Sequence, residues 1–213
     1  MPFGVDEAGK GPVLGSMFAA SVVGEPDALP AGIADSKTLR PARRVELAKA
    51  LAREPAVSIG VGEVPVEEID DPETDMNTLT VAAQARALRA VEVAGESGHV
   101  DAGDVNAERF GRRVADRLAA DVSITAEHGA DERYPLVAAA SVIAKVSRDA
   151  HVQALAVEYG TEVGSGYPGD AQTRSFLGEY VERTGELPGC ARRSWQTSRD
   201  VKRAVAQTGL DEF

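Results

Sequence analysis

The chain has 213 residues, 43% of them hydrophobic, which suits one folded domain and is enough to bury a core without disulfides. Its 34 acidic and 23 basic residues give a formal net charge of −11, so any contact with nucleic acid has to depend on a local basic patch. One cysteine, Cys190, excludes a disulfide framework and a cysteine-rich zinc site. Because the sequence has neither a long apolar run nor a signal-peptide pattern, we expect a soluble, cytoplasmic protein with no membrane partner.

Short apolar segments alternate with longer helical segments along the chain. A glycine-rich bend at residues 9–12 joins the first two strands, and the segment 63–75, with seven acids and no base, is interpreted as a loop or solvated face. The predicted strands are residues 3–5, 17–23, 57–64, 99–101 and 122–125, and the predicted helices are 41–53, 78–94, 107–120, 135–159 and 171–183. This alternation predicts an α/β sheet with helices packed on it, in one domain with a helical C-terminal extension.

The basic residues are divided unevenly between lysine and arginine. Five are lysines (10, 37, 49, 145 and 202), and the other 18 are arginines. An acidic composition that is poor in lysine and rich in alanine and valine resembles that of proteins from salt-adapted archaea, in which concentrated salt screens self-repulsion. The alternative is an acidic enzyme from an ordinary environment.

Several common catalytic motifs are missing. Residues 9–15 look like a dinucleotide fingerprint, but the third glycine comes one residue late, and no Walker-type run occurs. The histidines at 99, 128 and 151 lack metalloprotease spacing, and Cys190 has no partner motif. Nucleotide-binding loops and nucleophilic triads are therefore unsupported.

Acidic residues lie at the ends of three predicted strands. Asp6 and Glu7 close the first strand, Asp101 closes the fourth, and Glu127 and Asp131 follow the fifth. Residues beyond strand ends line the ligand crevice of an α/β sheet, and converging carboxylates there fit a site for Mg²⁺ or Mn²⁺. Solvated surface acids are the alternative for each residue alone. Because neighbouring strand residues point to opposite faces, we expect Asp6 and Glu7 to share a site only if the strand ends between them.

Five short blocks keep a characteristic order and spacing from residue 3 to about 200. They are Asp-Glu-Ala-Gly-Lys-Gly-Pro at 6–12, Asp-Ser-Lys at 35–37, Val-Asp and Asp-Val-Asn within 100–106, Glu-His-Gly-Ala-Asp at 127–131 with Ala-Ala-Ser-Val-Ile-Ala-Lys at 139–145, and Gly-Ser-Gly-Tyr-Pro at 164–168. With these blocks the chain resembles type 2 ribonuclease H (ribonuclease HII) of the archaeal type. The resemblance implies a ribonuclease H-like mixed sheet flanked by helices.

The resemblance also implies an active site. It places the family's catalytic acids at Asp6, Glu7, Asp101 and Asp131, with Asp6 and Asp101 as principal metal ligands. Glu7 would hold a metal or its water, and Asp131 would complete a second site. The implied reaction is endonucleolytic hydrolysis of the RNA strand of RNA–DNA hybrids and of ribonucleotides embedded in duplex DNA. Two metals, Mn²⁺ or Mg²⁺, would support it and leave 5′-phosphate and 3′-hydroxyl ends, a chemistry that serves DNA replication and repair.

Substrate contacts follow from the same resemblance. The turn of Gly9, Lys10 and Gly11 corresponds to the loop whose backbone reads the ribose 2′-hydroxyl, the group that distinguishes RNA from DNA. Lys10 stands where most relatives carry arginine, so it keeps the charge and loses the bidentate fork. Tyr167 would lie against the sugar at the RNA–DNA junction, with a buried turn tyrosine as the alternative. The candidates for phosphate contacts are Ser36, Lys37, Ser141 and Lys145.

The last seven residues form a separate motif. Gln207, Leu210 and Phe213 give the pattern Gln-x-x-Leu-x-x-Phe, which resembles the peptide that binds the groove of the sliding clamp (PCNA). It ends in one aromatic residue where the usual motif has two, and a frayed terminus is the alternative. We therefore divide the chain into a catalytic domain at 1–206 and a clamp-binding tail at 207–213, and we expect a monomer.

Two other functions remain open from the sequence. One is a metal-dependent phosphoesterase acting on small phosphate esters, against which the Gly-Lys-Gly turn and Tyr167 argue. The other is a catalytically silent protein that binds the clamp or a hybrid, against which the four intact acids argue.

Overall fold

The computed structural model describes residues 1–33 and 39–211, and their side chains as far as residue 207. Its centre is a mixed sheet with the strand order β3-β2-β1-β4-β5. The strands are β1 (Phe3–Ala8), β2 (Met17–Val23), β3 (Ser58–Val64), β4 (Ser97–Asp101) and β5 (Ser123–Glu127). β2 pairs antiparallel with both β1 and β3, whereas β1, β4 and β5 run parallel. The predicted α/β class and mixed sheet are confirmed.

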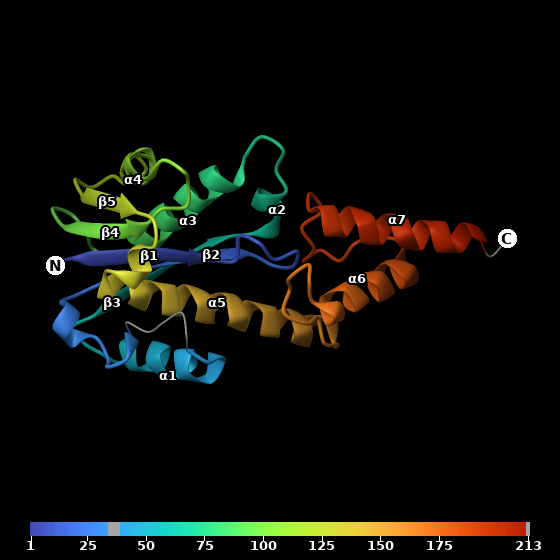
Figure 1. Ribbon diagram of the computed structural model, residues 1–213, viewed down its shortest axis with the longest axis horizontal. Helices are drawn as coiled ribbons and strands as arrows, with labels where there is room; N and C mark the ends of the chain where they lie inside the picture. The colour runs from blue at the N-terminus through green and yellow to red at the C-terminus, as the bar shows by residue number, and fades with distance from the viewer. Residues whose placement is uncertain (34–38, 212–213) are drawn as a thin grey trace.

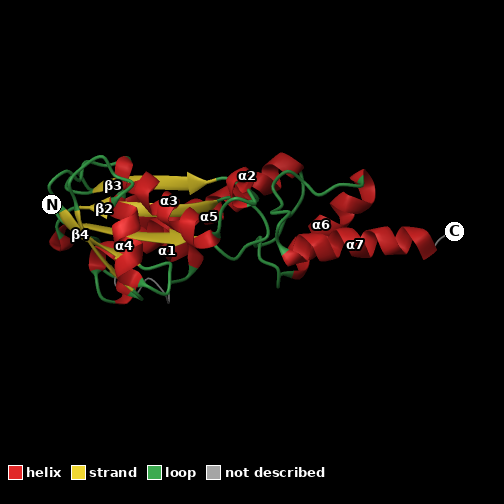
Figure 2. Ribbon diagram, turned by 90° about the horizontal axis from the view of Figure 1, so that it is seen from above, coloured by secondary structure: helices red, strands yellow, loops and turns green. Residues whose placement is uncertain are grey.

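Helices cover both faces of this sheet. They are α1 (Pro41–Leu51), α2 (Val66–Ile69), α3 (Met76–Arg89), α4 (Ala107–Ala115), α5 (Pro135–Tyr159), α6 (Ala171–Thr184) and α7 (Gln196–Asp211), with 3₁₀ turns at Pro26–Ala28 and Ala130–Glu132. In Figure 1, α3 and α4 lie above the sheet, and α5 and α1 lie below it. The helices α6 and α7 lie beyond the end of the sheet and extend the long axis of the molecule (Figure 2).

The long helix α5 is built to cross the sheet closely. Pro135 fits its first turn, and Gly160, in the left-handed conformation at φ 65°, ends it. Gly4 of β1 faces the start of α5, and a Cβ atom there would come within 2.3 Å of the Leu136 carbonyl carbon. The glycine therefore lets the helix backbone rest directly on the central strand.

Several predicted boundaries differ from the structure. The helix α3 begins at Met76 because the Asp75 side chain accepts a hydrogen bond from the Thr78 N–H, and it ends at Arg89, five residues before the predicted end, ahead of the buried Val93. α4 ends at Ala115 instead of residue 120, and β1 continues to Ala8 instead of ending at residue 5. The acidic segment 63–75, predicted as a loop or solvated face, contains the last strand residues of β3 and the short helix α2, and most of its residues are exposed or half-buried.

The C-terminal extension has a core of its own, shared with the second half of α5. Its buried members are Val13, Leu14, Val152, Leu155, Val163, Phe176, Leu177, Val181, Leu187, Cys190, Ala191 and Val201. An isolated bridge between Leu14 and Ala191 joins the extension to the segment that follows the glycine-rich bend. The predicted helical extension is thus confirmed, and it is fixed to the chain near the first predicted acids. None of the helices in the described part of the chain has the length and apolar character needed to cross a membrane.

Candidate active site

The site lies where the pairing of β1 with β4 ends. The last paired residues are Val5 and Val100, so Asp6 and Asp101 follow side by side from two neighbouring parallel strands. Residues in register on parallel strands point to the same face of a sheet. The topology therefore brings these two acids, 95 positions apart in the sequence, to one edge.

Asp6 is almost buried, at 6% exposure. Burial, and then the neighbouring charge of Glu7, raise the pKa of Asp6 well above its ordinary value; a hydrogen bond with the Ser141 side chain opposes this, and the charge of Asp101 adds to it. The Asp6 Oδ1 atom also accepts a hydrogen bond from the Glu7 N–H at 2.7 Å. The carboxylate is thus held in place, and its charge is poorly compensated.

Glu7 points to the other face of the sheet, where α3 packs. Its Oε2 accepts a hydrogen bond from the Gln84 Nε2 of α3 at 2.6 Å, and its Oε1 pairs with the Lys10 Nζ at 2.5 Å. Burial raises the pKa of Glu7, and the charge of Lys10 opposes that shift. β1 continues through both acids, so the strand does not end between them and their side chains leave it on opposite faces. Asp6 and Glu7 still belong to one electrostatic cluster, because Asp101 raises the pKa of both.

Asp101 is held from two sides. Its Oδ1 accepts a hydrogen bond from the Ala130 N–H at 2.8 Å, and its backbone oxygen accepts one from the Gln84 Nε2 at 2.9 Å. The first bond holds the 3₁₀ turn that carries Asp131, itself only 7% exposed, against the end of β4. Gln84 bonds both Glu7 and Asp101, so α3 ties the two strand ends together.

The donor chemistry of this cluster fits a divalent cation. Carboxylate oxygens are the ligands that Mg²⁺ and Mn²⁺ prefer. Burial raises the pKa of both Asp6 and Glu7, the charge of Asp101 adds to both shifts, and a bound cation would compensate the carboxylate charges. Within residues 1–33 and 39–211, however, no group of three or more Asp, Glu, His or Cys side chains is arranged so that it could hold a metal ion. Glu127, the remaining strand-end acid, pairs instead with Arg133 at 2.6 Å and accepts a hydrogen bond from the Tyr134 hydroxyl at 2.7 Å.

The turn of Gly9, Lys10 and Gly11 lies directly beside the acids. Gly9 has a φ of 98°, in the region that favours glycine. The side chain of Lys10 is directed at Glu7, so it contributes a positive charge to the acid cluster. On the other side of the turn, a Cβ atom at Gly11 would lie 3.6 Å from the Tyr167 ring. The structure therefore places Tyr167 beside the turn, and its predicted contact with the sugar stays a prediction.

Tyr167 is 41% exposed and is supported from behind by an arginine. The Arg148 guanidinium lies 5.0 Å from the centre of its ring and donates a hydrogen bond to the Ser165 carbonyl at 2.9 Å. The ring is thus held at the surface of the site, and the alternative of a buried turn tyrosine is wrong.

Ser141 and Lys145 lie on the α5 side of the cluster. Ser141 is buried and bonds Asp6, and the Lys145 Nζ donates to the Ser141 Oγ at 2.8 Å. Both predicted residues therefore adjoin the acids. Ser36 and Lys37 lie outside the described residues, so their predicted phosphate contacts stay predictions.

Comparison with known proteins identifies the family. The sequence model described as Ribonuclease HII matches residues 3–198. The chain belongs to the ribonuclease HII family. Proteins named Ribonuclease HII from Halobacterium salinarum and Haloarcula marismortui are 65% and 63% identical to it, over 99% and 100% of both chains. These sources are halophilic archaea, which agrees with the interpretation of the acidic, lysine-poor composition.

Solved structures agree with this assignment. The ribonuclease H2 of Pyrococcus horikoshii is 35% identical, with a TM-score of 0.86 over 97% of this chain and 99% of that one. An RNase HII from Archaeoglobus fulgidus, solved in complex with PCNA, is 37% identical, with a TM-score of 0.79 over 92% and 95% of the chains. Bst-RNase HIII, solved in complex with Mn²⁺, is 20% identical and shares the fold, with a TM-score of 0.76 over 97% of this chain and 70% of that one. The protein is therefore a hydrolytic nuclease of the ribonuclease HII family with a ribonuclease H-like fold.

Two residues of this ribonuclease HII site were missed at the sequence level. Gln84 is fully buried and joins Glu7 to Asp101, but a glutamine in an alanine-rich helix carries no recognisable signal. Asp104 is also buried, and it accepts a hydrogen bond from Arg109 at 2.7 Å that fixes the loop after β4. Its signal was present, because Asp104 belongs to one of the blocks that carry the resemblance.

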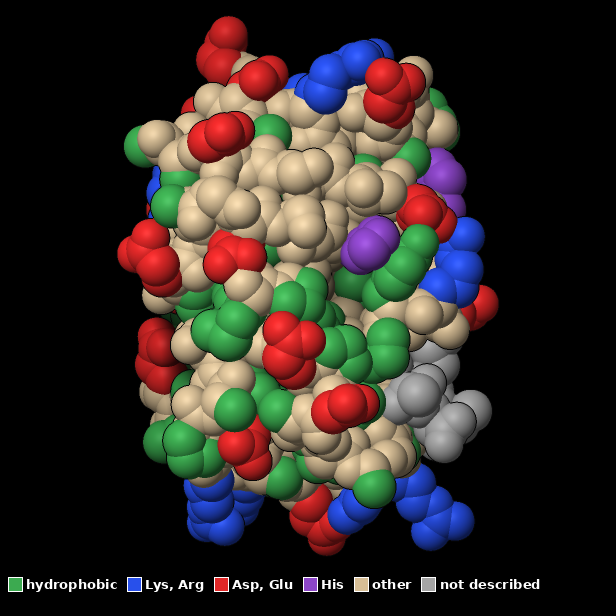
Figure 3. All heavy atoms as spheres, turned by 90° about the vertical axis from the view of Figure 1, so that its left-hand side faces the viewer, with side chains coloured by type: hydrophobic (Ala, Val, Ile, Leu, Met, Phe, Trp, Pro, Cys, Tyr) green, Lys and Arg blue, Asp and Glu red, His purple; other side chains and the backbone are tan. Residues whose placement is uncertain are grey.

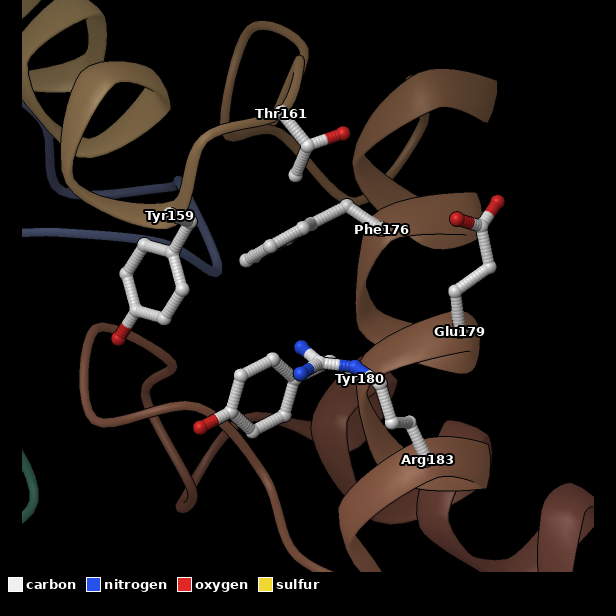
Figure 4. A pocket seen from close by; sticks show the side chains of 6 residues that line it. All are labelled: Tyr159, Thr161, Phe176, Glu179, Tyr180 and Arg183. Atoms are coloured by element: carbon white, nitrogen blue, oxygen red, sulfur yellow. The ribbon is translucent and has the colours of Figure 1, made fainter.

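A hollow in the extension lies away from the acids. It has a volume of about 250 Å³ and is lined by Tyr159, Thr161, Phe176, Glu179, Tyr180 and Arg183 (Figure 4). Its aromatic rings pack on one another, and the Arg183 guanidinium lies 5.2 Å from the centre of the Tyr180 ring. None of the predicted site residues lines it.

The predicted clamp motif is described only in part. Gln207 is exposed on α7, which runs on to Asp211. The side chain of Leu210 and all of Phe213 lie outside the described residues, so the clamp-binding prediction and the division at residue 207 stay predictions.

Proposed function

We propose that this ribonuclease HII cuts the RNA strand of RNA–DNA hybrids and the DNA strand that carries an embedded ribonucleotide. The observation that carries the proposal is the convergence of the buried acids Asp6 and Glu7 with the half-buried Asp101 at one sheet edge, beside the turn at residues 9–11. A phosphodiester bound there would meet the acids and the turn together. Members of the ribonuclease HII family cleave RNA in RNA–DNA hybrids, which supports the substrate class.

The acids would hold divalent cations, Mn²⁺ or Mg²⁺. Asp6 and Asp101 would be the principal ligands, with Glu7 holding a metal or its water and Asp131 completing a second site. When bound, such cations supply an activated water and neutralise the charge that develops on the leaving 3′-oxygen. Crowded carboxylate charge supports this assignment, as does Bst-RNase HIII, a structural relative solved with Mn²⁺.

The remaining residues position the substrate. Ser141 and Gln84 hold Asp6 and Glu7 from opposite faces of the sheet, which fixes both carboxylates before the substrate arrives. Tyr167 would lie against the sugar at the RNA–DNA junction, and Lys145 would contact a phosphate. Attack of water on the phosphorus with departure of the 3′-oxygen leaves 5′-phosphate and 3′-hydroxyl ends.

We also propose that the C-terminal tail binds the sliding clamp. The RNase HII of Archaeoglobus fulgidus was solved in complex with PCNA, and it matches 92% of this chain. In the present structure α7 projects away from the sheet (Figure 1), so a partner bound to its end would leave the acids accessible. Such a contact would deliver a monomeric nuclease to replicating DNA.

A labelled DNA duplex with one ribonucleotide tests the main proposal. It is incubated with Mn²⁺ or Mg²⁺ at low and molar salt, beside an all-DNA and an all-RNA duplex of the same sequence. We expect cleavage on the 5′ side of the ribonucleotide, 5′-phosphate products and two intact controls. Survival of all three duplexes, with tight binding to the first, would favour a silent binding protein, and hydrolysis of a chromogenic phosphate ester alone would favour a small-ester phosphoesterase.

A further inference from the structure

Arg192 is the largest fully buried side chain of the described residues. No described carboxylate lies within ion-pair distance of its guanidinium. Its partners are three backbone carbonyls: the Nη2 donates to Gly9 at 2.7 Å, the Nη1 to Lys10 at 3.1 Å and the Nε to Gly15 at 2.9 Å. The strongest compensating charge is that of Asp70, beyond ion-pair distance, and it only partly opposes the lowering of the Arg192 pKa by burial. A buried charge without an opposite charge in contact is costly, so such an arrangement calls for a reason beyond packing.

The reason lies in the geometry of the turn. A trans peptide unit is planar, and its C=O and the next residue's N–H point in opposite directions. Because the carbonyls of Gly9 and Lys10 both point at Arg192, the N–H groups of Lys10 and Gly11 point away from it. Neither N–H donates a hydrogen bond to another residue in the described part of the chain. Arg192 thus turns two unused donors outward, in the loop that contacts Glu7 on one side and Tyr167 on the other.

We propose that Arg192 is a positioning residue for ribose recognition. By holding the two carbonyls, it sets the direction of the Lys10 and Gly11 N–H donors that meet the 2′-hydroxyl. The inference rests on the proposed function, and it adds a residue from the far end of the chain that touches no substrate itself.

The side chain of Arg192 is fixed at its base as well as at its head. The Arg192 N–H donates to the Val13 carbonyl at 2.8 Å, and the Ser198 Oγ donates to the Arg192 carbonyl at 2.7 Å. The guanidinium also lies 4.9 Å from the centre of the Trp195 ring. The C-terminal extension therefore holds Arg192 in place, and Arg192 in turn holds the backbone of the turn at residues 9–11.

Arginine is required here for its shape. Its planar head donates in three directions at once, whereas a lysine ammonium at the end of a shorter stem cannot reach three separated carbonyls. Arg192→Lys keeps the positive charge and removes the planar group that donates three hydrogen bonds, so it tests the positioning role separately from the charge. Arg183→Lys is the matched control, because Arg183 also lies over an aromatic ring in the extension but is exposed and far from the turn.

The test compares binding and cleavage. Dissociation constants are measured for a duplex with one ribonucleotide and for the identical all-DNA duplex, in an Asp101→Asn background that prevents cleavage. We expect Arg192→Lys to weaken binding of the ribonucleotide duplex about tenfold and to leave the dissociation constant of the all-DNA duplex unchanged. The reason is that the affected hydrogen bonds join the turn to the 2′-hydroxyl, which the all-DNA duplex lacks. In the cleaving background, the KM for the ribonucleotide duplex should rise by a similar factor. Arg183→Lys should change neither the ratio of the two dissociation constants nor the KM.

The outcomes separate the possible failures. If Arg192→Lys is folded and the ratio of its two dissociation constants equals that of the unmodified protein, the proposal is overturned. If the unmodified protein itself fails to discriminate between the duplexes, the proposed function fails first.

A second measurement needs no substitution at Arg192. Amide NMR signals of Lys10 and Gly11 are followed in the Asp101→Asn protein as each duplex is added. We expect both signals to shift further with the ribonucleotide duplex than with DNA. Equal responses to the two duplexes would contradict the outward direction of the N–H groups, even if Arg192→Lys does not fold.

Discussion

At the scale of single residues, the cluster of Asp6, Glu7 and Asp101 lowers the free energy of unfolding of the protein. Burial, Glu7 and Asp101 raise the pKa of Asp6, so the folded protein binds a proton at this carboxyl more tightly than the unfolded chain does. The free energy of unfolding therefore falls as pH rises from the ordinary pKa to the raised one. Above that window the repulsion is fully present unless a cation relieves it.

Asp6→Asn should remove this repulsion. An amide oxygen can still accept the hydrogen bond from the Glu7 N–H, so we expect the thermal midpoint without divalent metal to rise by about 2–4 °C, equal to about 1 kcal/mol. Differential scanning fluorimetry in a chelator checks this. Mn²⁺ should then raise the midpoint of the unmodified protein and leave that of the variant unchanged. A lower midpoint for the variant in the chelator at neutral pH would contradict the account.

At the scale of elements, the sequence pattern predicted what local signals control. Proline at the start and glycine at the end defined α5 to the residue, and all five strands were expected. The C-terminal ends of α3 and α4 were predicted wrongly because the packing of residues beyond each helix, such as Val93 after α3, decides where the helix ends. The candidate site divides in the same way. The four acids were predicted from motif blocks, whereas Gln84 joins Glu7 to Asp101 only through tertiary contacts.

Gly4→Ala tests the close crossing of α5 over β1. Its Cβ atom would meet the backbone of Leu136 and Val137 at 2.3 Å, where no side chain can yield. We expect a loss of about 1–3 kcal/mol in the free energy of unfolding, measured by denaturant titration. Gly178→Ala is the matched control, because the site on α6 is open and alanine favours helices, so this change should stabilise by up to about 1 kcal/mol. Equal effects of the two substitutions would show that the crossing is looser than described.

At the scale of the whole molecule, the net charge of −11 is spread over the surface. On the face of the molecule at its N-terminal end, single Asp and Glu side chains are scattered across the surface, and Lys and Arg side chains lie toward the edges (Figure 3). Self-repulsion of this kind opposes the compact state and is reduced when salt screens it.

Stability should therefore increase with salt. We expect the thermal midpoint to rise between about 0.1 M and about 2 M KCl, because the Debye length falls well below the spacing of surface charges. Thermal unfolding followed by circular dichroism checks this, and a midpoint that is flat or falls with KCl would contradict the role given to surface charge.

The assignment of the active site is tested most directly by comparing Asp101→Asn with the unmodified protein on a duplex with one ribonucleotide. Asp101 couples to both Asp6 and Glu7, so its charge is essential to the cluster but not to the sheet. The matched control is Asp116→Asn, an exposed acid at the end of α4. We predict that Asp101→Asn stays folded, with a thermal midpoint no lower than that of the unmodified protein, and binds the duplex without cutting it, whereas Asp116→Asn cuts normally. Cleavage by folded Asp101→Asn at the unmodified rate would contradict the assignment of the active site.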